Sequence, residues 1–307
     1  MLGVRLAGDG PGAPVRRLLR FEDEVAAEEP LEIRLVRGSL ERRESVAVVL
    51  RTPGDDFALA AGFLFTEGVL ADRGQVARIS YCLDPEVDQA QRYNVVNVWL
   101  RPGAEPELGR GRRFAVNSAC GACGKAGLDD LRVGRLAPLP RAADGGLPAG
   151  LLAALPGRLR AVQPLFDRTG GLHAAGLFDG EGRLLAAAED VGRHNAVDKV
   201  IGRLWLEGRL PWREERPAVL QVSGRAGFEI VQKAAAAGIP LVASVSAPSS
   251  LALETAEVLG ITLVGFSRGD RLNVYTHPGR LWLEEAGEGA VPTASGDLTC
   301  GKERWAG

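Results

Sequence analysis

Three short apolar segments in the last third of the chain constrain the fold most strongly. They cover residues 218–222, 241–245 and 261–266, and none alternates polar and apolar residues as a half-exposed strand would. A segment of helical character lies between each pair, and Gly238 and Gly260 stand where these helices are expected to end. Apolar strands that alternate with helices predict a parallel sheet covered on both faces, so the expected fold class is α/β.

The first third of the chain predicts a different arrangement. Residues 31–37 and 45–50 have the pattern of two strands joined by a charged turn, as in a hairpin. Residues 57–65 (FALAAGFLF) are apolar nearly all round, which predicts a buried helix. Further strands are expected at 76–82 and 93–100, so this part is a mixed α+β region.

The middle of the chain predicts a second hairpin and another helix. Residues 172–178 and 183–188 flank Asp179-Gly180-Glu181-Gly182, whose composition favours a tight turn. Apolar residues then recur at helical spacing over 197–205, and Gly208 is expected to end this helix.

Changes in composition along the chain predict its domains. We expect a flexible tail over 1–14, a smaller N-terminal α+β subdomain over 15–110, the main α/β domain over 111–281 and a C-terminal tail over 282–307. Residues 134–150 are rich in Gly, Pro and Ala, which predicts a linker or mobile loop inside the main domain.

Length and composition exclude several classes of protein. The 307 residues include 37 basic and 39 acidic side chains, a formal net charge of −2, whereas nucleic-acid and membrane-surface binders usually carry a basic excess. No segment approaches the roughly 18 consecutive apolar residues of a membrane span. Four cysteines are too few for a disulfide scaffold. We therefore expect a cytoplasmic protein whose partners are neither nucleic acid nor membrane.

Two of the four cysteines stand close together in Cys120-Gly121-Ala122-Cys123. Two thiols at this spacing can bind half of a zinc site, form a disulfide or present one activated sulfur. A zinc site needs two more ligands, and the other cysteines and the histidines are isolated in the sequence. The flanking glycines predict a mobile loop, and Lys125 favours the thiolate. Chemistry on sulfur is therefore the preferred interpretation, with two small buried residues in a tight turn as the alternative.

The loops after the three C-terminal strands form a second candidate site. In an open parallel sheet these loops lie at one edge, where ligands bind. Ser223-Gly224-Arg225 and Pro248-Ser249-Ser250 each open a predicted helix, whose first N–H groups suit an anion. Arg268 and Arg271 add charge suited to phosphate. This pattern predicts a nucleotide or another phosphate-bearing ligand, with helix capping and solvated arginines as the alternative.

Two histidines are harder to interpret from their neighbours alone. His194 lies in the charged segment 189–199, at a strand-to-helix junction where Asp190 or Asn195 could cap the helix. This junction is equally consistent with a cap and with a binding site. His173 follows two glycines, and we expect it to be a core or loop residue.

Several segments in the same order resemble the FdhD family of formate dehydrogenase accessory sulfurtransferases. The resemblance covers roughly residues 28 to 281, and the segments are EEPLEIRLVRG, LRTPGDDFALAAGFLFTEGVL, NSACGACGK, GGLHAAGLF, EDVGRHNAVDKVIG, SGRAGFEIVQKAAAAGIPLVASVSAPSSLALETAEVLGITLVGF and RGDRLNVYTHPGR. The tail beyond Arg280, which carries Cys300, has no counterpart in this pattern.

The resemblance implies a function that composition could not reveal. The family takes sulfane sulfur from a cysteine desulfurase and delivers it to the molybdenum or tungsten bis(molybdopterin guanine dinucleotide) cofactor, which then enters the catalytic subunit of formate dehydrogenase. Guanine nucleotide would be a partial mimic of this substrate. The resemblance also implies a homodimer and, for the main domain, a cytidine-deaminase-like three-layer α/β/α sandwich.

Residue by residue, the resemblance makes Cys120 the persulfide carrier and gives Cys123 a supporting catalytic role. It predicts a cofactor-binding stretch and further residues of the same pocket; they are Phe266, Ser267, Arg268, Gly269, Asp270, Arg271, Ser223, Gly224, Arg225 and His194. No metal is expected to be bound by the chain itself.

Three other functions would fit parts of the sequence. A dithiol oxidoreductase would need Cys120 and Cys123 equally. A zinc-dependent deaminase needs H-x-E and P-C-x-x-C, but Ala175 stands two positions after His173, and Ala119 precedes Cys120. A guanine-nucleotide-binding module without sulfur transfer would use only the strand-end loops.

Overall fold

The structure is a computed structural model that describes residues 2–7, 17–38, 42–82, 88–107, 114–115, 136–140, 146–214, 217–269 and 271–282. Its strands are β1 (Leu2–Ala7), β2 (Arg17–Glu22), β3 (Glu29–Arg37), β4 (Arg42–Arg51), β5 (Val76–Tyr81), β6 (Val95–Leu100), β7 (Phe114–Ala115), β8 (Leu147–Pro148), β9 (His173–Phe178), β10 (Leu184–Asp190), β11 (Val219–Val222), β12 (Leu241–Ser244), β13 (Thr262–Arg268), β14 (Arg271–Val274) and β15 (Leu281–Trp282). Its α-helices are α1 (Asp56–Thr66), α2 (Ala149–Arg160), α3 (Pro164–Thr169), α4 (Arg193–Leu206), α5 (Phe228–Ala236) and α6 (Ser250–Leu259).

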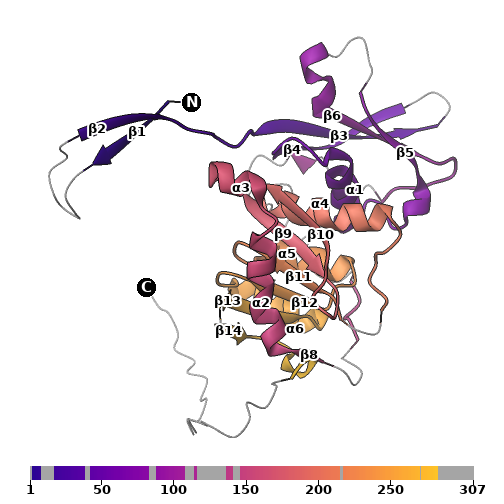
Figure 1. Ribbon diagram of the computed structural model, residues 1–307. Coiled ribbons are helices and arrows are strands. Elements are labelled where there is room, and N and C mark those ends of the chain that lie inside the picture. The colour runs from indigo at the N-terminus through magenta and orange to yellow at the C-terminus, as the bar shows by residue number, and fades with distance from the viewer. Residues whose placement is uncertain are drawn as a thin grey trace, which may run out of the picture.

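Two sheets organise this part of the chain (Figure 1). The N-terminal sheet has the strand order β5-β6-β3-β4-β7. Its centre is the predicted hairpin, in which β3 and β4 are antiparallel, and β6 pairs with β3 in parallel. The inward side chains of β3 are fully buried at Leu31, Ile33 and Leu35, as the alternating pattern of the sequence predicts.

The second sheet has six strands in the order β10-β9-β11-β12-β13-β14. Strands β11, β12 and β13 are parallel, as predicted, and α5 and α6 connect them. The predicted hairpin of β9 and β10 is also present. Its turn is held by the Asp179 carboxylate, which accepts hydrogen bonds from the backbone N–H groups of Glu181 and Arg183 at 3.0 and 2.8 Å.

Helices cover both faces of the six-stranded sheet. On one face, α2 buries Leu152, Leu155 and Leu159 against alternate residues of the strands, which are Ala174, Phe178, Val219, Leu241, Ala243 and Val264. Full burial of a leucine stabilises a fold by about 1.5–3 kcal/mol, so this seam fixes α2 on the sheet. The intervening strand residues face α4, α5 and α6, and they include Ala175, Leu177, Leu220, Val222, Val242 and Leu263. This part of the chain is therefore an α/β structure in three layers.

Helices α1 and α4 join the two sheets. Figure 1 shows them between the N-terminal sheet and the six-stranded sheet. One hydrophobic core extends from β3 and α1 through α4 to the face of the six-stranded sheet that α4, α5 and α6 cover. A fully buried polar group lies within it: the Lys233 ammonium is 2.9 Å from the Asp198 carboxylate and donates to the Thr66 hydroxyl at 2.9 Å. The N-terminal half and the half that contains the six-stranded sheet are thus held together by apolar contact and by the bonds from Lys233 of α5 to Thr66 at the end of α1 and to the adjacent Glu67 carboxylate, which is 3.1 Å away.

The structure differs from the sequence-based expectation in three places. The predicted linker over 134–150 ends inside α2, which begins at Ala149 and whose register places the three buried leucines. Strand β1 lies within the predicted tail and pairs with β2 in a hairpin. Strand β14, which the sequence pattern does not indicate, extends the six-stranded sheet beyond β13.

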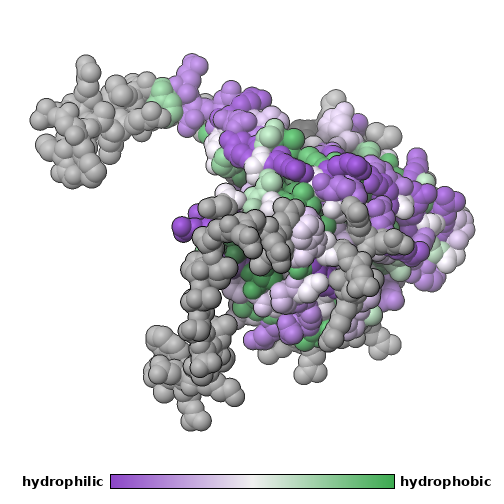
Figure 2. Space-filling view, turned by 60° about the horizontal axis from the view of Figure 1, so that its bottom comes forward, coloured by the Kyte–Doolittle hydropathy of each residue, from purple (hydrophilic) through white to green (hydrophobic). Residues whose placement is uncertain are grey.

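The surface is mixed in character. On the face in Figure 2, hydrophilic residues predominate and hydrophobic residues form smaller patches between them. Within the described residues, no helix combines the length and the apolar character that crossing a bilayer requires.

Candidate functional site

The carboxyl ends of four strands lie at one edge of the six-stranded sheet. Strand β10 runs parallel to β11 because both are antiparallel to β9, and β12 and β13 follow in the same direction. We call this the strand-end edge. It is formed by His173 at the start of β9 and by four residues at or after strand ends, which are Asp190, Ser223, Val245 and Arg268.

The loop after β11 is fastened to the start of β9. The Ser223 N–H donates to the Ala174 carbonyl, and the Ala174 N–H donates to the Ser223 hydroxyl, both at 2.9 Å. Gly224 lies directly against His173, because a Cβ at Gly224 would be only 3.2 Å from the imidazole Nδ1. Arg225 is exposed. Helix α5 begins only at Phe228, so its first N–H groups do not belong to the predicted Ser-Gly-Arg segment.

The loop after β12 uses its predicted residues to cap a helix. Ser249 is the N-cap of α6, and its hydroxyl accepts a hydrogen bond from the Ala252 N–H at 3.3 Å. Its own N–H donates to the Ala226 carbonyl at 3.2 Å, which ties this loop to the one after β11. The Ser249 hydroxyl therefore caps the helix, which is the alternative to binding an anion.

The end of β13 turns its side chains in different directions. Phe266 has a left-handed backbone (φ 51°) and a ring that is 42% exposed. Such a conformation is strained for an aromatic residue and occurs preferentially at functional sites. The Arg268 guanidinium folds back over β12, where Nε donates to the Val245 carbonyl at 2.9 Å. Arg271 is the register partner of Arg268 across the β13–β14 turn, so two exposed cations lie together.

Ser267 faces the interior instead. It is fully buried, and its hydroxyl donates to the carbonyl of Leu152 in α2 at 3.3 Å. Pro156 stands four residues after Leu152 and has no N–H to make the ordinary helical hydrogen bond to that carbonyl. The Ser267 hydroxyl supplies the missing donor, so within the predicted cofactor-binding stretch this side chain has a structural partner.

His194 connects the beginnings of two helices. It lies in the first turn of α4, and its Nε2 is 3.2 Å from the carboxylate of Glu229 in the first turn of α5. Gly192 is the N-cap of α4, so neither Asp190 nor Asn195, the two residues that could have capped this helix, does so. The Asp190 carboxylate instead accepts from the Gly192 N–H at 2.8 Å and pairs with the buried Lys199 at 2.7 Å.

His173, expected from the sequence to be a core or loop residue, lies at the centre of this edge. Burial and the positive charge of Arg193 lower its pKa below 6.5, and Arg225 adds to this effect while Asp190 opposes it. The imidazole is therefore neutral near pH 7, with one N–H donor and one acceptor nitrogen. Nothing in the sequence around a lone histidine that follows two glycines indicates that it lies at this edge. Its position becomes visible only in the assembled fold.

A cavity of about 660 Å³ opens beside His173, between the sheet and the segment that contains α2 and α3. It is lined by Pro156, Leu159, Arg160, Gln163, Phe166, Gly170, Gly171, Leu172, His173, Ser223 and Val245. Its volume lies within the roughly 300–1,000 Å³ that is usual for small-molecule sites. Val245 also accepts the hydrogen bond of Arg268, so the cavity adjoins the end of β13.

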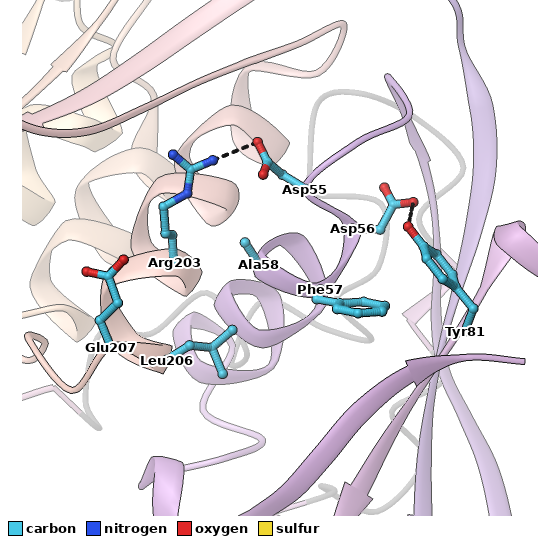
Figure 3. Close-up of a pocket in the computed structure, with 8 residues that line it drawn as sticks. All are labelled: Asp55, Asp56, Phe57, Ala58, Tyr81, Arg203, Leu206 and Glu207. Atoms are coloured by element: carbon cyan, nitrogen blue, oxygen red, sulfur yellow. Dashed lines mark hydrogen bonds and ion pairs between the residues drawn. The ribbon is translucent and has the colours of Figure 1, made fainter.

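A second, shallower pocket of about 400 Å³ lies between α1 and α4 (Figure 3). Four of the polar groups that line it are paired with one another: Arg203 with Asp55 at 2.8 Å, and the Tyr81 hydroxyl with Asp56 at 3.1 Å. The fifth, the Glu207 carboxylate, lies 3.8 Å from Arg209. Burial raises the pKa of Tyr81, and the Asp56 carboxylate raises it further, so this hydroxyl keeps its proton. These groups have protein partners, which makes the pocket the weaker candidate for a ligand.

The structure brings His194, Ser223, Gly224, Arg225 and Arg268 to the strand-end edge and turns the Ser267 side chain away from it. Cys120, Cys123 and Asp270 lie outside the described residues. Cys82 is buried, at 1% exposure. Among the described residues, no group of three or more His, Cys, Asp or Glu side chains is arranged to hold a metal ion.

The fold and this edge define a mixed α/β protein with two main sheets and an arginine-bearing site at the strand ends. A family model described as the FdhD/NarQ family matches residues 26–282, which is most of the chain. The chain therefore belongs to the FdhD/NarQ family.

Two relatives that are named sulfur carrier protein FdhD are about half identical to this chain. A sulfur carrier protein FdhD from Streptomyces avermitilis is 51% identical over 265 residues, covering 86% of this chain and 91% of the relative. One from Anaeromyxobacter dehalogenans is 51% identical over 290 residues, covering 91% and 97%. The crystal structure of a candidate formate dehydrogenase accessory protein from Desulfotalea psychrophila is similar, with a TM-score of 0.65 and 28% identity over 92% of this chain and 99% of that one.

Proposed function

We propose that the chain is a sulfurtransferase that carries sulfane sulfur as a persulfide on Cys120. The observation that carries the proposal is the family match over residues 26–282, which spans Cys120 and Cys123, together with relatives of about half-identical sequence that are named sulfur carrier proteins. The donor is a cysteine desulfurase.

Loading is an exchange between sulfur atoms. The Cys120 thiolate attacks the outer sulfur of the donor persulfide, the donor S–S bond breaks, and the donor leaves as a thiolate. An ordinary cysteine thiol has a pKa of about 8.5, so the neighbouring cation Lys125 would raise the thiolate fraction at neutral pH. Cys123 supports the transfer: its attack on the inner sulfur would form a Cys120–Cys123 disulfide and release the outer sulfur as sulfide, two electrons more reduced. A cellular dithiol would then reduce the disulfide.

The acceptor is the molybdenum or tungsten bis(molybdopterin guanine dinucleotide) cofactor, bound as a substrate. Its diphosphates suit the exposed cations of the strand-end edge, which are Arg225, Arg268 and Arg271. After transfer, the sulfurated cofactor passes to the catalytic subunit of formate dehydrogenase, and the carrier works as a homodimer. The strand order β10-β9-β11-β12-β13, with helices on both faces, supports a cytidine-deaminase-like fold for this half.

Intact mass spectrometry tests the carrier role. The full-length protein is incubated with a cysteine desulfurase and cysteine, and the expected product is heavier by one sulfur atom. Cys120→Ala should abolish this adduct, while Cys123→Ala should retain it, because only Cys120 receives the sulfur. Absence of the adduct from the unmodified chain, or its persistence in Cys120→Ala, would refute the proposal. Equal loss in both variants would favour a dithiol oxidoreductase instead.

A further inference from the structure

Thr52, the residue after β4, is bonded through each of its polar groups to a segment that is distant in the sequence. Its N–H donates to the Asp190 carboxylate at 3.1 Å, its hydroxyl accepts from the Val191 N–H at 3.1 Å, and its carbonyl accepts from the Lys199 ammonium at 2.8 Å. Thr52 is 6% exposed, and Asp190 is fully buried. Residues 190–199 lead from the end of β10 into α4, and we call them the β10–α4 junction. Thr52 therefore fastens the end of β4 to this junction.

A second contact between β4 and the junction lies two residues earlier. The Asn195 side chain donates to the Leu50 carbonyl at 2.7 Å and to the Asp190 carboxylate at 2.9 Å. The buried Arg51 is bonded within the N-terminal half instead, because its guanidinium donates to both carboxylate oxygens of Asp56 at 3.0 Å. The end of β4 is thus held from two sides, by the N-terminal half and by the β10–α4 junction.

The β10–α4 junction supplies part of the strand-end edge. Asp190 is the last residue of β10 and the register partner of His173 in β9. Arg193 opens α4 and lies close to His173: burial lowers the pKa of this histidine, and the Arg193 guanidinium lowers it further. The contacts that hold the end of β4 on the junction therefore also set its position relative to the strand-end edge.

The segment that leads to Cys120 starts beside β4. Strand β7 pairs with β4 in parallel, with Ala115 opposite Val48. It therefore points toward the end of β4 at which Thr52 lies. Cys120 follows Ala115 by five residues in the sequence, and five residues span at most about 18 Å. The position of β4 thus limits the distance over which this cysteine can reach the strand-end edge.

We propose that Thr52 and Asn195 are positioning residues for sulfur delivery: they hold β4, and with it the origin of the Cys120 segment, at a fixed place against the strand-end edge. This inference rests on the proposed function, in which Cys120 carries the sulfur and the acceptor binds at that edge. Loading uses an external donor and does not need this alignment, whereas delivery brings together two parts of one chain. A misplacement of about 1 Å can slow a reaction as much as a hundredfold, so the two steps should respond differently.

Paired variants separate positioning from stability. Thr52→Val keeps the shape of the side chain but removes the acceptor of the Val191 N–H, whereas Thr52→Ser retains a hydroxyl. Thr255→Val is the matched control, because Thr255 is also buried (3% exposed) and its hydroxyl donates to the Leu251 carbonyl within α6, away from β4. Each valine variant loses one hydrogen bond of about 1 kcal/mol, so the two should unfold at similar temperatures. Asn195→Ala is a second, independent variant of the contact with β4.

Two measurements on the full-length carrier test the proposal. Each variant replaces the sulfur carrier of a cell that makes formate dehydrogenase; the activity of that enzyme is measured, and the purified carrier is examined by intact mass spectrometry. Thr52→Val and Asn195→Ala should lower formate dehydrogenase activity about tenfold. The fraction of carrier that bears the Cys120 persulfide should rise at the same time, because loaded protein accumulates before a slowed step. Thr52→Ser and Thr255→Val should match the unmodified chain.

The possible failures of the positioning role and of the carrier role are distinguishable. Normal formate dehydrogenase activity with Thr52→Val and Asn195→Ala, while the unmodified chain is loaded, would overturn the positioning role alone. A loss of activity without a rise in the loaded fraction, or an equal loss with Thr255→Val, would also overturn it, since a merely structural defect has this result. If the unmodified chain takes up no sulfur, the carrier proposal fails, and the positioning role fails with it.

Discussion

Gly62 of α1 and Gly202 of α4 lie where the two helices touch through their backbones. A Cβ on Gly62 would be 1.9 Å from the Asp198 carbonyl oxygen, and a Cβ on Gly202 would be 1.9 Å from the carbonyl oxygen of Ala58. No side chain fits between the helices at this crossing. The contact joins the N-terminal sheet to the six-stranded sheet, so it fixes the relative position of the two halves.

Replacing either glycine should therefore be costly. Gly202→Ala forces α4 away from α1, and overpacking of this kind destabilises a fold by about 1–3 kcal/mol or more. Urea unfolding of the full-length protein measures the loss. Gly157→Ala in α2 is the matched control, because a Cβ there meets open space and alanine favours a helix over glycine by about 1 kcal/mol. Equal effects of the two substitutions would contradict the close contact.

The sequence was sufficient to locate the strand-end edge but insufficient to predict its side-chain geometry. Apolar strands 218–222, 241–245 and 261–266 alternate with helices, and parallel strands must end at one edge, so Ser223 and Arg268 could be placed together in advance. Where each side chain points depends on the backbone. The left-handed Phe266 interrupts the regular alternation of β13 just before Ser267 turns inward to α2.

The cavity could not be foreseen because helix α2 was not. Its sequence contains Pro156 and two glycines and follows a Gly/Pro-rich stretch, so local propensity argues against a helix. Burial of three leucines against the sheet outweighs that propensity. Gln163 and His173 come to line one cavity only once α2 and α3 cover the sheet, and nothing in the sequence near either residue indicates this.

The Ser267 hydroxyl should stabilise the fold by replacing the N–H that Pro156 lacks. Ser267→Ala leaves the Leu152 carbonyl without this donor, and the expected loss in the free energy of unfolding is about 1 kcal/mol. In a Pro156→Ala background the backbone N–H returns, so Ser267→Ala should cost much less there. A double-mutant cycle by urea unfolding measures this coupling. Additive effects would show that the hydroxyl and the proline are independent.

The backbone of Phe266 should store strain that glycine can relieve. Phe266→Ala and Phe266→Gly both remove the ring, but only alanine keeps a Cβ in the left-handed region, at a cost of roughly 1–2 kcal/mol. Phe266→Gly should therefore unfold at a higher urea concentration than Phe266→Ala. If the exposed ring contributes to ligand binding, the two variants should lose GDP affinity equally. A glycine variant no more stable than the alanine variant would argue against backbone strain.

The buried Asp198 should give the fold a pH dependence opposite to that of an ordinary paired carboxylate. Burial raises its pKa from 3.8 to about 6, although Lys233 and Thr66 oppose the shift. Burial alone would lower the pKa of Lys233, but the Asp198 and Glu67 carboxylates outweigh it and raise that pKa, so Lys233 stays protonated throughout this range. The folded chain therefore holds a proton on Asp198 at pH values where the unfolded chain has lost it.

The sign follows from this difference in bound protons. Stability contributed by Asp198 is fully present below about pH 3.8 and is lost as the pH rises through about 6. In Asp198→Asn the amide does not titrate. Every other carboxylate is present in both proteins, so its contribution cancels when the two free energies of unfolding are subtracted. The free energy of unfolding of the unmodified protein minus that of Asp198→Asn should thus fall between about pH 4 and about pH 6. A difference that rises over this window would mean that the attraction of Lys233 exceeds the effect of burial and that the Asp198 pKa lies below 3.8.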